Sequence, residues 1–441
     1  MEVYHSASYS TNHCCKCHYN NGDVIGRNLN INLLGLDFTE NDDEDMYAIA
    51  SGTLDGKIVY VVAGGNGKIY TMTKDEFQNK IYHHITSIYN NDKKGYVKIH
   101  GSTYNGKYFV LVGNYGGIIY SKDAENWKAV YDTGKYNNTL TSSLYSVCYN
   151  HHLDKFVAVG YDCKISVFSI YDDKVINYVS SQYDKTPNTS SDYLPQQLRF
   201  IIYDDINRRY ILVGHNNKLR YCDDDKSDSH IIDYDSWIDV SPENITHPNG
   251  TTFGYQSVVY NRLTNTYVVV GNDGIIIYTN DITDRNSWKI SDSGLYDNTM
   301  SYADKNNNKI CIELQGISYD YKNNLYITVG WGSTILYTDD LTKRWIRYLD
   351  TSSSTTKYQF VINNPDGKIV SAGGTRVFIV NSVSILKRPS HLTNELLHKL
   401  FPIGYQFKKT IQYNPYNMYY FGTWEERYDT SSNMFTYTRT G

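Results

Sequence analysis

Short apolar runs alternate with polar turns along most of the chain, and one arrangement of them recurs. An apolar run is followed by a Gly, two or three polar residues and a second apolar run that ends near a Tyr. The copies are 60–75, 108–123, 155–169, 209–224, 266–281, 325–340 and 368–380. Val, Ile and Tyr favour strands, and Gly and Asn accept the positive φ of tight turns. Each copy is therefore predicted to be a β-hairpin.

Two further strands are predicted around most hairpins. One precedes the hairpin, and these segments are 144–150, 198–204, 255–261, 314–320 and 358–364. The other follows it and often carries a Trp, at 126–132, 236–240, 287–291 and 344–349. Four antiparallel strands per unit, repeated at about 40–60 residues, are typical of propeller blades. We predict an all-β fold: a seven-bladed β-propeller over 47–386, with a short helix and a small C-terminal module.

The two ends of the chain are predicted to form smaller parts. Residues 1–46 are an N-terminal arm, in which 28–38 has a strand-like pattern. We expect this strand to pair with the last blade and close the ring, because an open ring leaves a strand edge exposed. In 387–441 the repeat stops. Leu residues at helical spacing within 387–402 predict a linker helix, and the small module follows.

Composition and charge exclude several classes of protein. The 441 residues include 42 Lys and Arg against 47 Asp and Glu, which argues against a nucleic-acid binder that works through bulk positive charge. No apolar run is long enough for a membrane-spanning helix, so we expect no membrane insertion. The 45 Tyr residues have two explanations. They reflect either the codon usage of an AT-rich genome or a Tyr-rich contact surface.

The N-terminal segment HCCKCH contains five residues that could bind zinc: His13, Cys14, Cys15, Cys17 and His18. Zinc sites usually combine spaced pairs of ligands, and adjacent residues cannot all reach one ion. We therefore favour a mobile or contact-making arm over a structural zinc site, and we predict no metal and no cofactor. The arm lacks the apolar core of a secretion signal, so the cysteines are expected to be reduced thiols.

Three hairpins are followed by a Ser or Thr, an Asp and a Trp in the same order. The residues are Ser121, Asp123 and Trp127; Thr279, Asp281 and Trp288; and Thr338, Asp340 and Trp345. This pattern resembles the Asp-box, or BNR-like, blade of sialidase-type propellers, although the Gly of that motif is missing in all three. The resemblance implies a structural role, in which the Asp caps a turn and the Trp packs between blades.

The C-terminal segment carries a second resemblance, to a small module of bacteriophage tail-fibre and baseplate proteins. Three ordered pieces match it: FPIG at 401–404, NP at 414–415 and FGTWE at 421–425. The motif positions are Pro402, Gly404, Asn414, Pro415, Gly422 and Trp424. This resemblance implies a virion protein of a phage tail, assembled in the host cytoplasm as a homo-oligomer, a trimer or higher. Its partners would be other tail proteins and a glycan or protein receptor on the host cell.

On this interpretation the protein is not an enzyme, and its propeller serves host adhesion or assembly. The alternative is a sialidase-like glycoside hydrolase or depolymerase with carboxylates at the central face. Arg residues that a sialidase-like triad would need cluster in two adjacent blades, namely Arg199, Arg208, Arg209, Arg220, Arg262 and Arg285. We therefore name no catalytic residue. The insertions at 170–197, 223–250 and 291–312 are expected to build one contact face, and the run DDD at 223–225 is expected to be solvated.

Overall fold

The computed structural model describes residues 24–35, 45–131, 143–181, 197–245, 252–295, 301–303, 309–311, 313–349, 358–363, 369–373, 376–387, 406–409, 424–429 and 434–439. The protein divides into two compact units. The larger comprises Asn32–Ile346 and Ser352–Ile379, and the smaller comprises Met1–Ile31, Arg347–Thr351 and Val380–Gly441. The boundaries that we drew between arm, propeller and terminal module stay a prediction.

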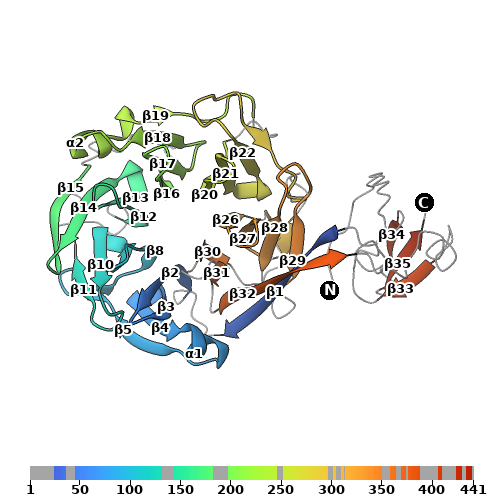
Figure 1. Ribbon diagram of the computed structural model, residues 1–441, viewed down its shortest axis with the longest axis horizontal. Helices are drawn as coiled ribbons and strands as arrows, with labels where there is room; N and C mark the ends of the chain where they lie inside the picture. Colours follow the sequence, from blue (N-terminus) through green and yellow to red (C-terminus); the bar gives the residue numbers. More distant parts are fainter. Residues whose placement is uncertain are drawn as a thin grey trace. The chain divides into compact units, whose positions relative to one another are not determined.

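Seven four-stranded sheets are arranged as the blades of a ring, so the predicted seven-bladed propeller is confirmed (Figure 1). The first three blades are β2(Met46–Leu54), β3(Lys57–Gly64), β4(Lys68–Thr73), β5(His83–Ser87); β8(Ile99–Tyr104), β9(Phe109–Gly113), β10(Gly117–Ser121), β11(Lys128–Val130); and β12(Leu144–Asn150), β13(Lys155–Gly160), β14(Ile165–Tyr171), β15(Lys174–Ser180). The next three are β16(Leu198–Asp204), β17(Arg209–Gly214), β18(Leu219–Asp223), β19(Ile238–Asp239); β20(Tyr255–Asn261), β21(Thr266–Gly271), β22(Ile276–Thr279), β23(Lys289–Ile290); and β26(Leu314–Asp320), β27(Leu325–Gly330), β28(Thr334–Thr338), β29(Ile346–Leu349). The seventh is β30(Tyr358–Asn363), β31(Ile369–Gly373), β32(Arg376–Lys387), β1(Val24–Gly35).

The ring is held together by its innermost strands. β2, β8, β12, β16, β20, β26 and β30 pack against one another in this order, and β30 packs back against β2. In the last blade the sheet order is β1-β32-β31-β30. This sheet includes a strand from the N-terminal part of the chain, and the ring-closing role of 28–38 stays a prediction.

The middle strands are buried on both faces, as their continuous apolar runs predict. Every residue of β9 and of β10 is buried. The core lies between consecutive blades: Ile211 and Val213 of the fourth blade pack in one cluster with Val269, Ile277 and Trp288 of the fifth. Burial on both sides removes the reason for a polar residue at every second position.

The hairpin turns contain the positive φ values that their Gly and Asn residues predict. Asn66 and Gly67 have φ of 53° and 66°, and Asp273 and Gly274 have 57° and 71°. Two consecutive residues in this region define a type I′ turn, whose twist matches that of the paired strands.

The remaining elements are small. Two short α-helices, α1(Lys74–Gln78) and α2(Asp228–Ile231), lie in the described part of the chain, along with the strand pairs β6(Tyr89–Asn90)–β7(Gly95–Tyr96) and β24(Ser301–Ala303)–β25(Lys309–Cys311). A separate three-stranded sheet has the order β33(Gln406–Lys409), β35(Met434–Arg439), β34(Trp424–Asp429). None of the helices that the structure describes has the length and apolar character needed to cross a membrane.

Several predictions fall outside the described residues. They concern the possible zinc ligands of the HCCKCH segment, the linker helix, and the motif positions Pro402, Gly404, Asn414, Pro415 and Gly422. Of the C-terminal motif, Trp424 alone is described, as the first residue of β34.

Candidate functional site

The innermost strand of every blade has an irregular register at its beginning. One residue is skipped in the pairing with the second strand, for example between Leu144 and Ser146 in β12 and between Leu198 and Phe200 in β16. Such a bulge leaves one residue unpaired and redirects its side chain. The seven skipped residues, here called the channel ring, are Tyr47, His100, Tyr145, Arg199, Gln256, Gln315 and Gln359. All seven line one hollow, together with Phe200.

The recurring Gly of the hairpins permits this arrangement. A Cβ atom on Gly160 would lie 1.9 Å from the carbonyl oxygen of Ser143, directly before the bulge of β12. The same position gives 2.1 Å at Gly214 and 2.1 Å at Gly330, again to backbone oxygens. The second strand therefore approaches the bulge more closely than any residue with a side chain allows.

Aromatic and cationic side chains follow one another along half of the channel ring. The Tyr47 and His100 ring centres are 5.8 Å apart, and those of His100 and Tyr145 are 5.1 Å apart in an edge-on arrangement. The Arg199 guanidinium lies 5.0 Å from the centre of the Tyr145 ring, and Lys98 Nζ lies 4.3 Å from that of Tyr47. These contacts are within the range of cation–π attraction.

Two of the three amides of the channel ring, those of Gln256 and Gln315, are fixed by hydrogen bonds. Arg199 Nε donates to Gln256 Oε1 at 2.8 Å, and Gln256 Nε2 donates to Asn272 Oδ1 at 2.9 Å. Gln315 Nε2 donates to Glu313 Oε2 at 2.7 Å. Asn272 belongs to a hairpin turn, so the turns support the side chains that the bulges direct into the hollow.

His100, which lines the hollow, is neutral, and so is His215, whose Nε2 lies 3.4 Å from Nε2 of Gln256. Burial lowers the pKa of His100 to about 3, with Lys98 and Arg199 adding to the effect, while the hydrogen bond to Asn114 opposes it. Burial, Arg199 and Lys218 lower the pKa of His215 to about 4. Burial also lowers the pKa of Arg199, but an arginine starts high enough to stay charged.

The hollow has a volume of about 60 Å³, which accommodates a few water molecules or one small chemical group. Pockets for drug-sized ligands measure roughly 300–1,000 Å³. None of the eight residues that line the hollow is an Asp or a Glu. Its groups can stack, donate hydrogen bonds and attract negative charge.

The Ser/Thr, Asp and Trp positions lie elsewhere, in the turns between third and fourth strands. Asp123 Oδ1 accepts hydrogen bonds from the backbone N–H of Glu125 at 2.9 Å and of Asn126 at 2.7 Å, and Ser121 donates to it at 2.9 Å. Partial burial alone would raise the pKa of Asp123, but these bonds and the side chain of Asn126 bring it down to about 2. Trp127 Nε1 donates to a backbone oxygen of the same turn.

The two other copies connect neighbouring blades. Trp288 Nε1 donates to the carbonyl of Val240 at 3.1 Å, and Trp345 Nε1 donates to Ser291 Oγ at 2.8 Å. Thr279 and Thr338 each donate to the carbonyl of the Asp two residues later, namely Asp281 and Asp340. None of these residues lines the hollow.

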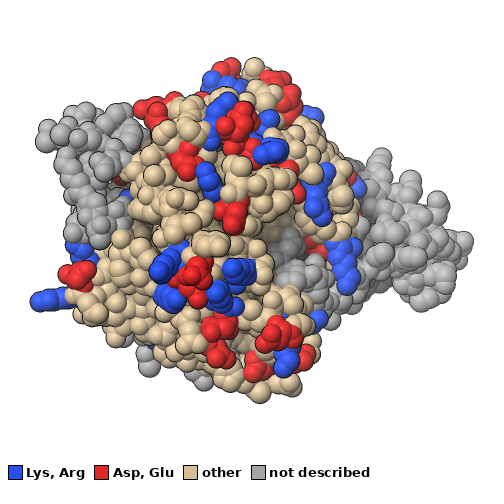
Figure 2. All heavy atoms as spheres, turned by 60° about the vertical axis from the view of Figure 1, so that its left-hand side comes forward, with Lys and Arg blue, Asp and Glu red and all other residues tan. Residues whose placement is uncertain are grey.

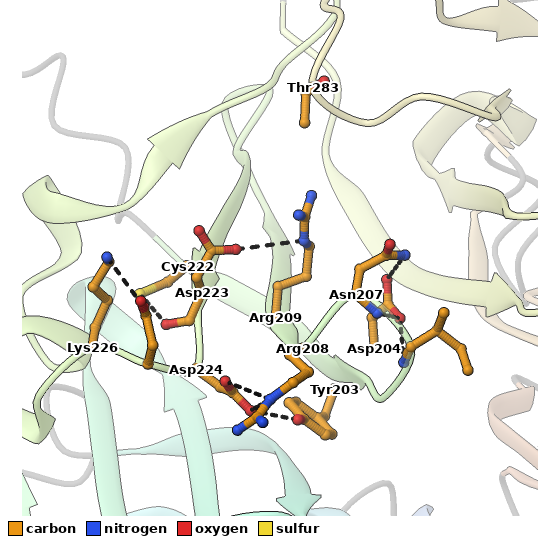
Figure 3. A network of polar contacts seen from close by, with 12 residues as sticks. Tyr203, Asp204, Asn207, Arg208, Arg209, Cys222, Asp223, Asp224, Lys226 and Thr283 are labelled. Carbon is orange, nitrogen blue, oxygen red and sulfur yellow. Dashed lines mark hydrogen bonds and ion pairs between the residues drawn. The ribbon is translucent and has the colours of Figure 1, made fainter.

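A polar network in the fourth blade shows why its acidic run is not simply solvated (Figure 3). The Asp224 carboxylate is buried and accepts hydrogen bonds from Tyr203 Oη at 2.6 Å and from Arg208 Nε at 3.2 Å. Burial would raise the pKa of Asp224, but these bonds and one from Asn150 lower it. The expectation of a solvated run is therefore wrong for Asp224, and Arg208 has a structural role.

The expectation of one contact face built by three insertions is also wrong in part. Residues 224–237 connect β18 to β19, the third and fourth strands of one blade. The other two predicted insertions, 170–197 and 291–312, contain connections from the last strand of one blade to the first strand of the next, and residues 240–250 of the middle insertion belong to a connection of this kind as well. Since consecutive strands are antiparallel, these two kinds of connection lie at opposite ends of the strands. On the face shown in Figure 2, basic and acidic side chains are interspersed, with no broad field of one sign.

Comparison with known proteins gives similarity at the level of structure alone. No protein-family profile and no curated protein sequence matches this protein. A solved structure described as YCF48 bound to D1 peptide is similar at 11% sequence identity and a TM-score of 0.54, over 83% of this chain and 98% of that one. YCF48 from Cyanidioschyzon merolae is similar at 12% identity and a TM-score of 0.53, over 79% and 98%. At these identities the similarity establishes the propeller fold.

These comparisons correct the functional interpretation of the sequence. The similar propellers are YCF48 proteins and not phage-tail components, so the prediction of a phage fibre or baseplate protein is wrong. They give no support to the phage-module or Asp-box resemblances either. None of the eight described residues that line the hollow supplies the carboxylates that the glycoside hydrolase alternative requires, and whether the protein is an enzyme stays a prediction. The homo-oligomeric state and the virion location stay predictions.

Proposed function

We propose that this protein is a non-enzymatic binding propeller that recognises a polypeptide segment at the channel ring. The observation that carries the proposal is that all seven blades direct one bulge residue into the same hollow. Two Tyr, one His, one Arg and three Gln make up this set. Tyr and Arg are enriched where proteins bind proteins, and Gln amides can pair with main-chain N–H and C=O groups.

The size and charge of the hollow favour a polypeptide over other ligands. A volume of about 60 Å³ is too small for a sugar or cofactor. The hollow can accept one side chain or one terminus of a partner polypeptide that lies across its opening. The net charge of −5 disfavours nucleic acid. A protein of the same fold is described as bound to a peptide, which adds support.

The lining residues also support a role in binding rather than catalysis. Hydrolysis needs a positioned acid, base or nucleophile. His100 is the one conventional general base of the lining, and its Nε2 is engaged with Asn114 Oδ1 at 3.0 Å. Arg199 and the Gln amides are binding groups.

A selection experiment tests the proposal. Random peptides are selected on the full-length protein, and their affinities are measured for the wild type, for Tyr145→Ala and for the control Tyr171→Ala, whose side chain is 70% exposed on the third strand of the same blade. We expect Tyr145→Ala to weaken binding about tenfold or more, as at interface hot spots, and Tyr171→Ala to leave it unchanged. Selected peptides that bind Tyr145→Ala as well as wild type, or a failure to select any, would overturn it.

A further inference from the structure

Arg199 differs from the other channel-ring residues in carrying a permanent charge. Its Nε donates to Gln256 Oε1, and its Nη1 donates to Gln197 Oε1 at 3.2 Å. Both acceptors are neutral amides. A guanidinium has five N–H donors, so the described part of the protein leaves most of them for another partner.

Arg199 is partly buried, but it has no carboxylate partner in direct contact among the described residues. No Asp or Glu among the described residues forms an ion pair with Arg199. Glu313 is close enough to influence its titration, but it accepts a hydrogen bond from Gln315. A charge removed from water is costly unless an opposite charge pairs with it. Arg199 borders a hollow with room for one small anionic group.

The surroundings indicate which anion would fit. His100 and His215 are neutral, and Lys98 lies over the Tyr47 ring, so Arg199 supplies the positive charge on its side of the hollow. One guanidinium matches one negative charge, and its planar fork pairs with the two oxygens of a carboxylate. The small volume also favours a carboxylate over a larger, doubly charged group.

We infer that the Arg199 guanidinium is an anchor for a carboxylate of the partner polypeptide. The carboxylate comes from the C-terminus of that polypeptide or from one of its Asp or Glu residues. The identity of the partner rests on the proposed function, but the affinity of the site for carboxylates does not. The Tyr145 ring and the Gln256 amide act as positioning groups, since both contact Arg199.

The first experiment measures the site without any peptide. Acetate is titrated into the full-length protein at constant ionic strength, with chloride as the reference, and the Nε–Hε signals of the arginines are followed by NMR. We expect a saturable shift of the Arg199 signal, with a dissociation constant on the order of millimolar. The shift should persist in the control Arg262→Gln, whose guanidinium lies over Tyr321 in another part of the propeller. If the Arg199 signal shows no saturable shift, the inferred carboxylate anchor is wrong, whatever the outcome of the peptide selection.

The second experiment uses peptides selected as above, compared as free acids, as C-terminal amides and with Asp and Glu replaced by Asn and Gln. We expect one of these neutralisations, and Arg199→Gln, to weaken binding about tenfold or more, and Arg199→Lys to weaken it less. Loss on amidation identifies a C-terminal carboxylate, and loss on side-chain replacement identifies an acidic residue. If peptides depend on Tyr145 but bind Arg199→Gln normally, the carboxylate anchor is wrong while the proposed function stands.

Discussion

The side-chain amide of Asn150 donates a hydrogen bond to the hydroxyl of Tyr210, 2.8 Å away on the next blade. Asn261 donates to Tyr326 in the same way at 2.8 Å, and the Tyr267 hydroxyl donates to the buried carboxylate of Asp204. In each pair an Asn or Asp ends an innermost strand, and a Tyr stands near the start of the second strand of the following blade. These pairs join consecutive blades at the end of the strands opposite the channel ring.

Replacement of Tyr210 by Phe tests this connection. The variant keeps the ring but removes one of two acceptors of the buried Asn150 amide, the other being Asp224, so we expect a loss of about 1–2 kcal/mol in the free energy of unfolding. Urea unfolding measures the difference. The control Tyr171→Phe changes an exposed hydroxyl and should stay within about 0.5 kcal/mol of wild type. Equal stability of both variants would show that the pair contributes nothing.

The glycine at the start of each bulge can be tested with a matched pair. Gly160→Ala places a methyl group against the Ser143 carbonyl, and we expect a loss of about 2–4 kcal/mol because backbone has to move. Gly106→Ala serves as the control: Gly106 has a φ of 90° and no atom within 4 Å of the new methyl group. It should lose only about 1 kcal/mol from the positive φ. Thermal or urea unfolding compares them, and similar losses would contradict the close-approach argument.

The pH dependence of stability should report on His100. Its pKa is about 3 in the folded protein, below the ordinary value of about 6.5 in the unfolded state, so the unfolded state binds the proton first as pH falls. His100 therefore does not reduce the free energy of unfolding above pH ~6.5, and it lowers this free energy progressively as the pH falls below that value, with a limiting slope of about 1.4 kcal/mol per pH unit.

The measurement compares urea unfolding of wild type and His100→Gln between pH 7 and pH 5, where most carboxylates remain charged. We expect a shallower fall for the variant. NMR offers a direct check: the C2–H signal of His100 should not titrate between pH 8 and pH 5. A normal titration near pH 6.5 would contradict the prediction.

Arg199 is expected to lower the free energy of unfolding of the protein when no partner is bound. Its charge is partly buried and its pKa is lowered by burial. Arg199→Met keeps much of the apolar stem and removes the charge, so we expect unfolding free energy to rise by about 1 kcal/mol while peptide binding falls. Arg262→Met, at a guanidinium that lies over Tyr321, should not raise stability. A clear loss of stability in Arg199→Met would show that Arg199 holds the fold together.

Much of the fold could be predicted from the sequence because the recurring hairpin pattern, two apolar runs around a Gly and a polar turn, is a strong local signal. The innermost strands β12, β16, β20 and β26 begin and end where the sequence analysis placed them. In the first two blades the innermost strands were missed. β2 and β8 read MYAIASGTL and IHGSTY, whose Ala, Gly, Ser and Thr residues resemble turn composition. Their burial depends on neighbouring blades, which a local pattern does not contain.

The candidate site was missed for a different reason. Its residues are of four types, so they form no motif, and neighbours in the ring come from different blades. A signal does exist in the spacing. In four consecutive blades the ring residue precedes the hairpin glycine by the same number of positions: Tyr145 and Gly160, Arg199 and Gly214, Gln256 and Gly271, Gln315 and Gly330. Alignment of the repeats on their glycines would have collected these positions into one column.

The bulges place two different demands on different residues of the same strand: most residues pair within the blade, and one lines the hollow. Each channel-ring residue is the one position of its innermost strand that is skipped in the pairing with the second strand, as at Tyr145 and Gln315. A substitution there changes the chemistry of the hollow with little demand on the blade that carries it. The seven positions, one per repeat, vary under the demands of the hollow and of their ring neighbours, such as the contacts of Arg199 with Tyr145 and Gln256. For an engineer they constitute a small combinatorial library on a scaffold that stays the same.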